Sequence, residues 1–154
     1  MQINLSGKRA VVAGGSRGIG RSIALGFAGA GAPVSICARG RTALDATSAE
    51  IAERGVTAHA SVCDLADKAA IATYIAAAAD SLGGIDILVN NASGFGAADD
   101  EESWTRSLNI DVMATVRASH AAIPSSRRPA EAPSSTSPRF QAIARVPARH
   151  PTRP

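Results

Sequence analysis

The chain has 154 residues, of which 45% are hydrophobic and 3% aromatic, enough for one domain with a core of Ala, Val, Ile and Leu. Its net charge of +3 is unevenly placed: residues 1–123 hold ten basic and twelve acidic side chains, and residues 124–154 hold six arginines and one acid. The basic character belongs to the last segment, which excludes treating the whole chain as a nucleic-acid binder, and no apolar run reaches the roughly 18 residues that a membrane span needs.

Strand and helix patterns alternate along most of the chain with short connections. Apolar side chains recur at helical spacing in some segments and form short continuous runs in others, bounded by Gly and Pro. In chain order the predicted elements are strand 9–13, helix 18–29, strand 34–38, helix 42–53, strand 56–62, helix 65–82, strand 85–89 and helix 103–123, with Ser103 as its N-cap.

Near-continuous apolar strands that alternate with helices are typical of a parallel sheet buried on both faces. Right-handed crossovers and a reversal after the third strand predict the strand order 3-2-1-4. The predicted fold class is therefore α/β, a Rossmann-type doubly wound parallel sheet that is truncated at about four strands.

The composition changes at Pro124. Residues 124–154 contain seven of the eight prolines, six arginines and five serines, and no helical or strand periodicity. Such a segment has too little apolar surface to offset its ordering entropy. We therefore divide the chain into a partial Rossmann domain, residues 1–123, and a disordered Pro/Arg/Ser-rich tail, residues 124–154.

A glycine-rich turn lies between the first strand and the first helix. Glycines there let the backbone approach a pyrophosphate, and the helix N-terminus offers free N–H groups and a partial positive charge. The pattern predicts a dinucleotide site, with candidate binding residues Gly14, Ser16, Arg17, Gly18, Ile19 and Gly20.

Two further loops lie where a dinucleotide would need them. Asp64 and Leu65 follow the third strand, where a carboxylate can reach the amino group of an adenine. Asn91, Ala92 and Ser93 follow the fourth strand, where backbone and small side chains can line the adenosine ribose. We expect both loops to contribute to the same cofactor site.

The charge at the end of the second strand bears on the choice of cofactor. An acid there would bond the ribose hydroxyls of NAD(H), but this chain has Arg39, with Arg41 nearby and Arg17 in the glycine turn. Guanidinium groups suit a 2′-phosphate through charge-assisted bonds, which favours NADP(H) over NAD(H). The alternative is that Arg39 and Arg41 are solvated loop charges.

Together these motifs resemble the short-chain dehydrogenase/reductase family over residues 5–123. The glycine spacing from Gly14 to Gly20 and the run Asn90-Asn91-Ala92 carry the resemblance, and the departures are Ala13 for the usual Thr and Ser93 for the usual Gly. The resemblance implies an NADP-dependent reductase of ketones or 3-oxoacyl groups, or a dehydrogenase of the matching alcohols. A small carbonyl or alcohol substrate is expected only of a complete enzyme.

The residues that carry the family's proton transfer have no counterpart in the sequence. The family uses a Tyr-x-x-x-Lys pair and an earlier Ser, but this chain has one tyrosine, Tyr74, which we predict to be a packing residue, and two lysines. The family's Asn in the fourth helix falls on Asp111, which is either a variant polar group at the site or a solvated or locally bonded acid.

Three hypotheses follow. The first is a truncated or frameshifted family member that binds NADP(H) but cannot transfer hydride alone. The second is a non-catalytic nucleotide-binding or protein-interaction module, which self-associates through an exposed edge of strand 85–89 and an uncovered apolar face of helix 103–123. The third is an active reductase with an unrecognised proton donor.

The remaining expectations concern compartment and partners. No signal peptide precedes the first strand, so we expect a cytoplasmic protein without a membrane partner. Cys37 and Cys63 end apolar runs and are predicted to be buried, reduced thiols. We predict no metal site, and a nucleic-acid role for the basic tail rests only on its charge.

Overall fold

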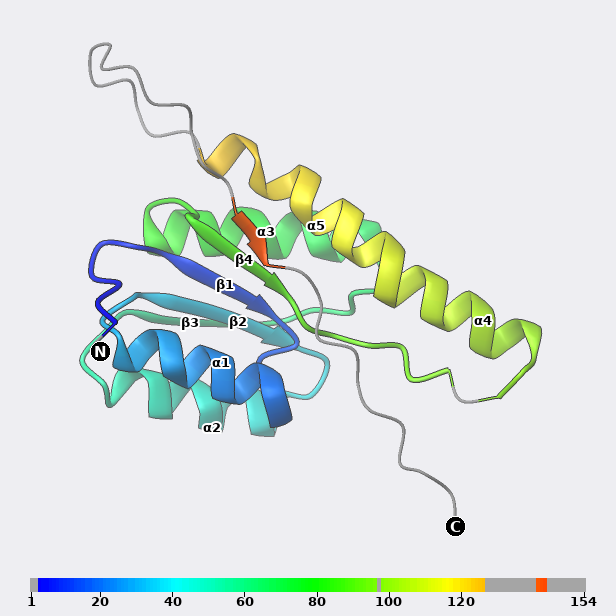
Figure 1. The fold of residues 1–154 in the computed structure, drawn as a ribbon, viewed down its shortest axis with the longest axis horizontal. Helices are drawn as coiled ribbons and strands as arrows, with labels where there is room; N and C mark the ends of the chain where they lie inside the picture. Colours follow the sequence, from blue (N-terminus) through cyan, green and yellow to red (C-terminus); the bar gives the residue numbers. More distant parts are fainter. Residues whose placement is uncertain (1–2, 97, 127–140, 144–154) are drawn as a thin grey trace.

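Parallel strands form a single sheet with helices on both faces (Figure 1). The computed structural model describes residues 3–96, 98–126 and 141–143. The elements are β1 (Ala10–Ala13), α1 (Gly18–Gly29), β2 (Val34–Ala38), α2 (Arg41–Ala52), β3 (Ala58–Val62), α3 (Lys68–Leu82), β4 (Ile87–Asn90), α4 (Glu101–Ser107), the π-helix η1 (Leu108–Met113), α5 (Ala114–Ala122), the 3₁₀-helix η2 (Pro124–Ser126) and β5 (Gln141–Ile143).

The strand order is β3-β2-β1-β4-β5, and each neighbouring pair is parallel. The predicted order 3-2-1-4 is thus confirmed. β1 lies at the centre, where Ala13 is opposite both Cys37 of β2 and Asn90 of β4. This register brings the ends of three strands, and the loops that follow them, to one edge of the sheet.

The two faces of the sheet carry separate cores. Val11 and Ala13 of β1 pack with α3 and α5, whereas Ala10 and Val12 pack with α1 and α2. Figure 1 shows these two helix pairs on opposite sides of the strands. Successive strand residues point to opposite faces, so a strand that is apolar at every position serves both cores.

The helix starts differ from those predicted. The helix expected over residues 65–82 begins at Lys68, because Asp67 caps it by accepting a hydrogen bond from the backbone N–H of Ala69 at 2.7 Å. The prediction of Ser103 as an N-cap is wrong, because the carboxylate of Asp100 accepts from the Ser103 N–H at 2.8 Å and α4 starts at Glu101.

The single helix predicted over residues 103–123 is also interrupted. The π-helix η1 separates α4 from α5, although the three segments run on as one continuous rod (Figure 1). A π-turn adds a residue to the turn and changes which side chains share a face. Helical periodicity along the sequence cannot locate such an insertion.

Two short segments of the predicted tail have regular structure. Residues Pro124–Ser126 form η2, and β5 pairs with β4 in the register Ile87↔Gln141. The edge of β4 that we expected to be exposed is therefore paired over Ile87–Val89, because an open edge leaves backbone groups free to bond any nearby extended segment. The rest of the predicted disorder, residues 127–140 and 144–154, lies outside the described residues.

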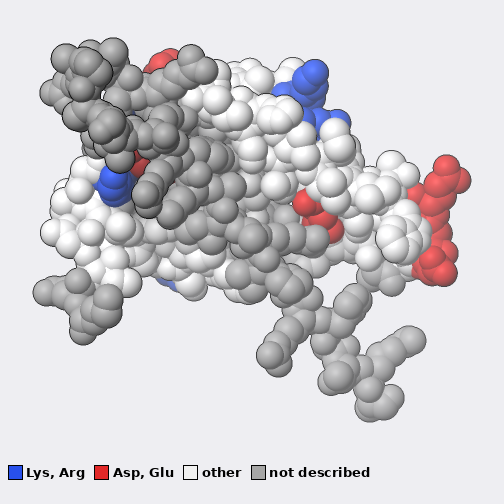
Figure 2. All heavy atoms as spheres, turned by 45° about the horizontal axis from the view of Figure 1, so that its top comes forward, with Lys and Arg blue, Asp and Glu red and all other residues white. Residues whose placement is uncertain are grey.

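The apolar face predicted for the last helix is exposed. Trp104, Leu108, Val112 and Val116 are between 39% and 59% exposed. Figure 2 shows acidic side chains gathered at the end of the molecule where α4 begins, where the sequence reads Asp99, Asp100, Glu101 and Glu102.

Candidate functional site

The glycine turn after β1 adopts conformations that only glycine accepts readily. Gly14 and Gly18 have φ of +83° and +55°. A Cβ on Gly20 would collide with the carbonyl oxygen of Gly14 and the side-chain amide of Asn91. Gly20 therefore lets α1 start directly against the turn, whereas a Cβ on Gly18 would meet open space.

Contacts from three other elements hold this turn in place. The backbone N–H groups of its first two glycines both donate to the carbonyl of Cys37 at 3.1 Å. The Thr47 hydroxyl on α2 donates to the carbonyl of Ser16 at 3.0 Å, and the Asn91 amide donates to the carbonyl of Gly14 at 2.9 Å. Groups of the protein itself therefore hold the shape of the turn.

The N-terminus of α1 is open toward the same edge. Arg17 is the N-cap residue, no side chain caps the helix, and its first turn contains no acid. Ile19, one residue into the helix, is 52% exposed. Uncapped N–H groups beside an open glycine surface fit a phosphate group, which is the part of a dinucleotide predicted to bind here.

Three arginines were predicted to lie near this edge. Arg17 and Arg39 are exposed, and within the described ranges neither forms an ion pair. Arg41 lies 3.6 Å from the carboxylate of Asp45, one turn further along α2. The positive charge at the end of β2 is therefore offset at Arg41 but not at Arg39.

The loop after β3 is a tight turn into α3. The Asp64 carboxylate accepts a hydrogen bond from the Ala66 N–H at 2.9 Å, and the Asp67 N–H donates to the Asp64 carbonyl at 3.1 Å. Asp64 is exposed, while Leu65 is only 7% exposed and packs into the core. Of the two predicted adenine contacts, Asp64 alone presents its side chain to solvent.

The loop after β4 crosses the end of β1. The Asn91 and Ala92 N–H groups both donate to the carbonyl of Ala13, at 3.2 and 3.1 Å. Further along, Gly94 lies so close to α4 that a Cβ would be 2.7 Å from the carbonyl oxygen of Arg106. The loop is therefore pressed between β1 and the α4 helix, with half-buried Ser93 between the two contacts.

Asp111 lies in η1 and faces this loop. Its carboxylate accepts a hydrogen bond from the Gly94 N–H at 3.0 Å. Of the two readings of Asp111 left open above, the locally bonded acid matches this contact. A role for Asp111 at the reaction centre stays a prediction.

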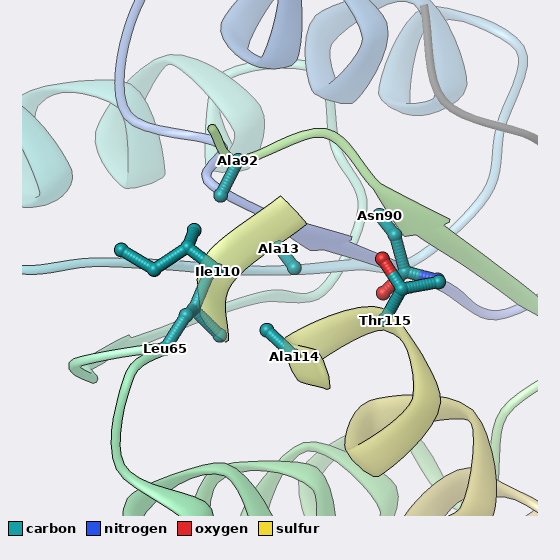
Figure 3. A pocket seen from close by; sticks show the side chains of 7 residues that line it. All are labelled: Ala13, Leu65, Asn90, Ala92, Ile110, Ala114 and Thr115. Carbon is teal, nitrogen blue, oxygen red and sulfur yellow. The ribbon is translucent and has the colours of Figure 1, made fainter. Parts of the chain in front are cut away.

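A small hollow lies between these loops and η1 (Figure 3). Its volume of about 10 Å³ leaves room for about one water molecule, and most of its lining is apolar. In Figure 3 the Asn90 and Thr115 side chains lie on one side, and Leu65 and Ile110 on the other. The hollow lies beside Ala13, directly before the glycine turn, and is too small for a dinucleotide. Its lining residues are Ala13, Leu65, Asn90, Ala92, Ile110, Ala114 and Thr115.

The single tyrosine of the sequence, Tyr74, is buried in the core. Tyr74 is 2% exposed, and its hydroxyl lies 3.0 Å from the Ser35 hydroxyl, which is in turn 2.8 Å from Nδ1 of His59. Burial raises the pKa of Tyr74 well above its usual value, so the phenol stays neutral. The prediction that Tyr74 is a packing residue is confirmed, and Cys37 and Cys63 are buried free thiols as expected.

Sequence reasoning missed the residues that hold the loops from behind. Thr47 lies on the buried face of α2 with Leu44 and Ile51, so helical spacing indicated that it points inward. Asn109 and Arg117 bond the loop after β3 from η1 and α5. They are eight residues apart, and their shared target is the backbone carbonyl of Ala66, which no sequence pattern marks.

Two features are absent from the described ranges. No helix there is long and apolar enough to cross a bilayer. Within the same ranges, no three His, Cys, Asp or Glu side chains gather closely enough to hold a metal ion.

Comparison with known proteins gives consistent similarities. The short chain dehydrogenase family profile matches residues 8–131. Gluconate 5-dehydrogenase from Gluconobacter oxydans is 38% identical over 112 residues, which are 73% of this chain and 43% of that protein. The chain therefore spans less than half the length of this relative.

Two solved structures extend the comparison. A short chain dehydrogenase from Burkholderia cenocepacia in complex with NADP is 38% identical with a TM-score of 0.73, over 79% of this chain and 52% of that one. A 7α-hydroxysteroid dehydrogenase complexed with NADH and 7-oxo glycochenodeoxycholic acid is 31% identical with a TM-score of 0.75, over 80% of this chain and 50% of that one. This chain spans about half the length of each.

Proposed function

Because this chain belongs to the short-chain dehydrogenase family of oxidoreductases, we propose that its glycine turn and neighbouring loops bind NADP(H) in preference to NAD(H). The observation that carries the proposal is the glycine turn, held by the bond from Asn91 to Gly14 and open over Gly18 and the start of α1. When bound, the dinucleotide supplies a nicotinamide that accepts or releases a hydride. This chain's residues bind and orient it.

The cofactor preference rests on charge. Arg17 and Arg39 are exposed on the two loops that follow the neighbouring strands β1 and β2. In the part of the chain that the structure describes, no carboxylate pairs with either of them. Unpaired guanidinium groups favour a dianionic 2′-phosphate over the two hydroxyls of NAD(H). Relatives bound to either cofactor are known, so the preference has to be measured on this chain.

We further propose that these 154 residues alone do not transfer hydride. Proton transfer at the substrate oxygen needs a group that can lose and regain a proton near working pH. The only tyrosine of the sequence is buried in the core with its pKa raised, and neither lysine stands four residues after it. Carbonyl reduction or alcohol oxidation is the reaction we propose for a protein that also carries the Tyr-x-x-x-Lys pair.

Fluorescence titration of the purified chain with NADPH and with NADH tests the binding proposal. We expect saturable binding that is tighter for NADPH, and Arg39→Ala should reduce that preference on the order of tenfold, because a charge-assisted bond is lost. Arg54→Ala is the control, since it removes the same charge at the opposite end of α2. Equal affinities that Arg39→Ala leaves unchanged would contradict the preference, and no binding of either nucleotide would contradict the site.

A turnover assay tests the second proposal. NADPH oxidation with a range of ketones and 3-oxoacyl thioesters should not exceed the rate without protein. Turnover by the pure chain would support the third hypothesis, a reductase with an unrecognised proton donor.

A non-catalytic interaction module remains the second candidate, and the exposed apolar side chains along α4, η1 and α5 favour it. Trp104 and Leu108 are 59% and 54% exposed one turn apart, and an apolar stripe of this kind is typical of a covered surface. Sedimentation of the chain with and without NADPH tests this candidate. Association that Trp104→Ser abolishes, with no cofactor required, would favour it over nucleotide binding.

A further inference from the structure

We propose that Arg117 and Asn109 form a clamp that positions the loop after β3 for the adenine end of the dinucleotide. This inference rests on the proposed function and adds to it two positioning residues, neither of which touches the glycine turn. The clamp comes from η1 and α5, while its target follows the third strand, 43 and 51 residues earlier in the chain.

Three hydrogen bonds form the clamp, and two of them end on the same carbonyl. The Ala66 carbonyl accepts from the Asn109 side-chain amide at 3.3 Å and from Nη1 of Arg117 at 3.2 Å. Nη1 of Arg117 also donates to the Asn109 side-chain oxygen at 2.8 Å. Each member thus contacts the other two, and the Ala66 carbonyl is held from two directions.

Ala66 connects the clamp to Asp64 through its own two backbone groups. The N–H of Ala66 donates to the Asp64 carboxylate, while its carbonyl is held by the clamp. The Asp67 N–H donates a hydrogen bond to the Asp64 carbonyl, and the Asp67 carboxylate caps α3. Both polar groups of Ala66 are therefore engaged, and the exposed carboxylate predicted to meet the adenine amino group has a defined direction.

The charge of Arg117 indicates that its contacts do more than pack α5 on α3. Arg117 is half-buried, and within the described residues its guanidinium forms no ion pair and bonds only the neutral oxygens of Ala66 and Asn109. α5 already packs on α3 through a stripe of small buried side chains, Ala114, Ala118 and Ala122. An apolar residue would serve that packing better, because burying part of a charge costs free energy.

The π-helix carries one member of the clamp. In a regular α-helix, residues eight apart lie on the same broad face, about 80° apart in direction. Asn109 lies within η1 (Leu108–Met113) and Arg117 follows in α5, and the wider π-turn between the two residues reduces this angle. The same segment carries Asp111, which holds Gly94 of the loop after β4. η1 therefore fixes the loops on both sides of the proposed site.

The test compares ligands that contain only part of the dinucleotide. Arg117→Met keeps the apolar stem and removes the donors. We expect its Kd for NADPH and for adenosine 2′,5′-bisphosphate to rise alike, on the order of tenfold, with the Kd for reduced nicotinamide mononucleotide unchanged. Arg106→Met is the matched control, because Arg106 lies on the same helical rod but pairs with Glu102 in solvent. Arg117→Lys, which keeps one charged donor, should restore part of the affinity.

Distinct outcomes separate the clamp from the proposed function. If the unaltered chain binds NADPH and Arg117→Met binds it equally well, the clamp is overturned. An equal loss for all three ligands would also overturn it, because that pattern reports general destabilisation. If the unaltered chain binds neither NADPH nor the bisphosphate, the proposed function fails and the adenine role with it. Hydrogen exchange at the Asp67 amide, faster in Arg117→Met than in Arg106→Met, still shows then whether the clamp orders the loop.

Discussion

At the scale of single residues, the shape of the site depends on Gly20 having no side chain. Gly20 leaves room for the carbonyl oxygen of Gly14 and for the amide of Asn91, which bond each other in the space that a Cβ would fill. The side-chain amide of Asn91 therefore holds the glycine turn in shape, and the role of its loop in lining the ribose stays a prediction.

Gly20→Ala is therefore expected to disrupt the turn. The added methyl must displace either the Gly14 carbonyl or the Asn91 amide, which costs about 1–3 kcal/mol of stability and misaligns the start of α1. We expect NADPH binding to weaken by at least about tenfold, a loss of about 1.4 kcal/mol in binding free energy. Isothermal calorimetry and urea unfolding measure the two effects.

The control for that experiment lies in the same helix. A Cβ on Gly26 would meet no atom within 4 Å, so Gly26→Ala should leave binding unchanged and stabilise the chain by about 0.5–1 kcal/mol. Equal binding by both variants would show that the contact at Gly20 does not shape the site.

At the scale of elements, the ends of the strands and helices are harder to predict than their interiors. The strands and helices that carry both cores follow from apolar spacing, because burial on two faces demands it. Their ends do not, since more than one residue near an end can start or cap a helix: Asp100 rather than Ser103 caps α4, and Asp67 caps α3, which begins at Lys68 rather than at the predicted Leu65. β5 was not predictable because it pairs with β4, which is distant in the chain, and the π-helix was not predictable because helical periodicity does not mark it.

An ion pair joins the starts of the neighbouring strands β1 and β4. Arg9 precedes β1 and Asp86 precedes β4, and they form a half-buried ion pair at 2.8 Å, reinforced by the Arg9 N–H and by a bond from the guanidinium to the Gly83 carbonyl. Burial alone would raise the pKa of Asp86, but the hydrogen bonds and charge of Arg9 outweigh it and hold the pKa below its usual value of 3.8.

This pair should make stability depend on pH in a defined range. A carboxyl whose folded pKa is lowered contributes stability that is present above its unfolded pKa and lost as pH falls through the folded one. We therefore expect the free energy of unfolding to decrease below about pH 4. Asp86→Asn should be less stable by about 2 kcal/mol at pH 7 and lose less stability on acidification. Urea unfolding between pH 7 and pH 2.5 measures this, and parallel curves for the two proteins would refute it.

At the scale of the whole molecule, the sheet order and the dinucleotide edge were both predictable. Glycine, proline and apolar runs mark the crossovers, and the reversal after β3 places the carboxyl ends of β1 and β4 together. What was not predictable is how the loops at that edge are fixed. Thr47, Asn109 and Arg117 act from helices behind the loops, and their partners are backbone carbonyls that leave no mark in the sequence.

Binding at this site has a thermodynamic consequence for the whole domain. A ligand that binds only the folded chain stabilises it by RT ln(1 + [L]/Kd), or about 2.7 kcal/mol at one hundred times Kd. For a domain of this size each kcal/mol corresponds to about 2–4 °C in Tm, so saturating NADPH should raise Tm by about 5–10 °C. At the same concentration NADH should raise it less, because its ribose hydroxyls gain nothing from Arg17 and Arg39. Differential scanning fluorimetry measures both shifts. A larger shift with NADH would reverse the assignment of these arginines, and no shift with either nucleotide would mean that the turn held by Cys37, Thr47 and Asn91 does not bind one.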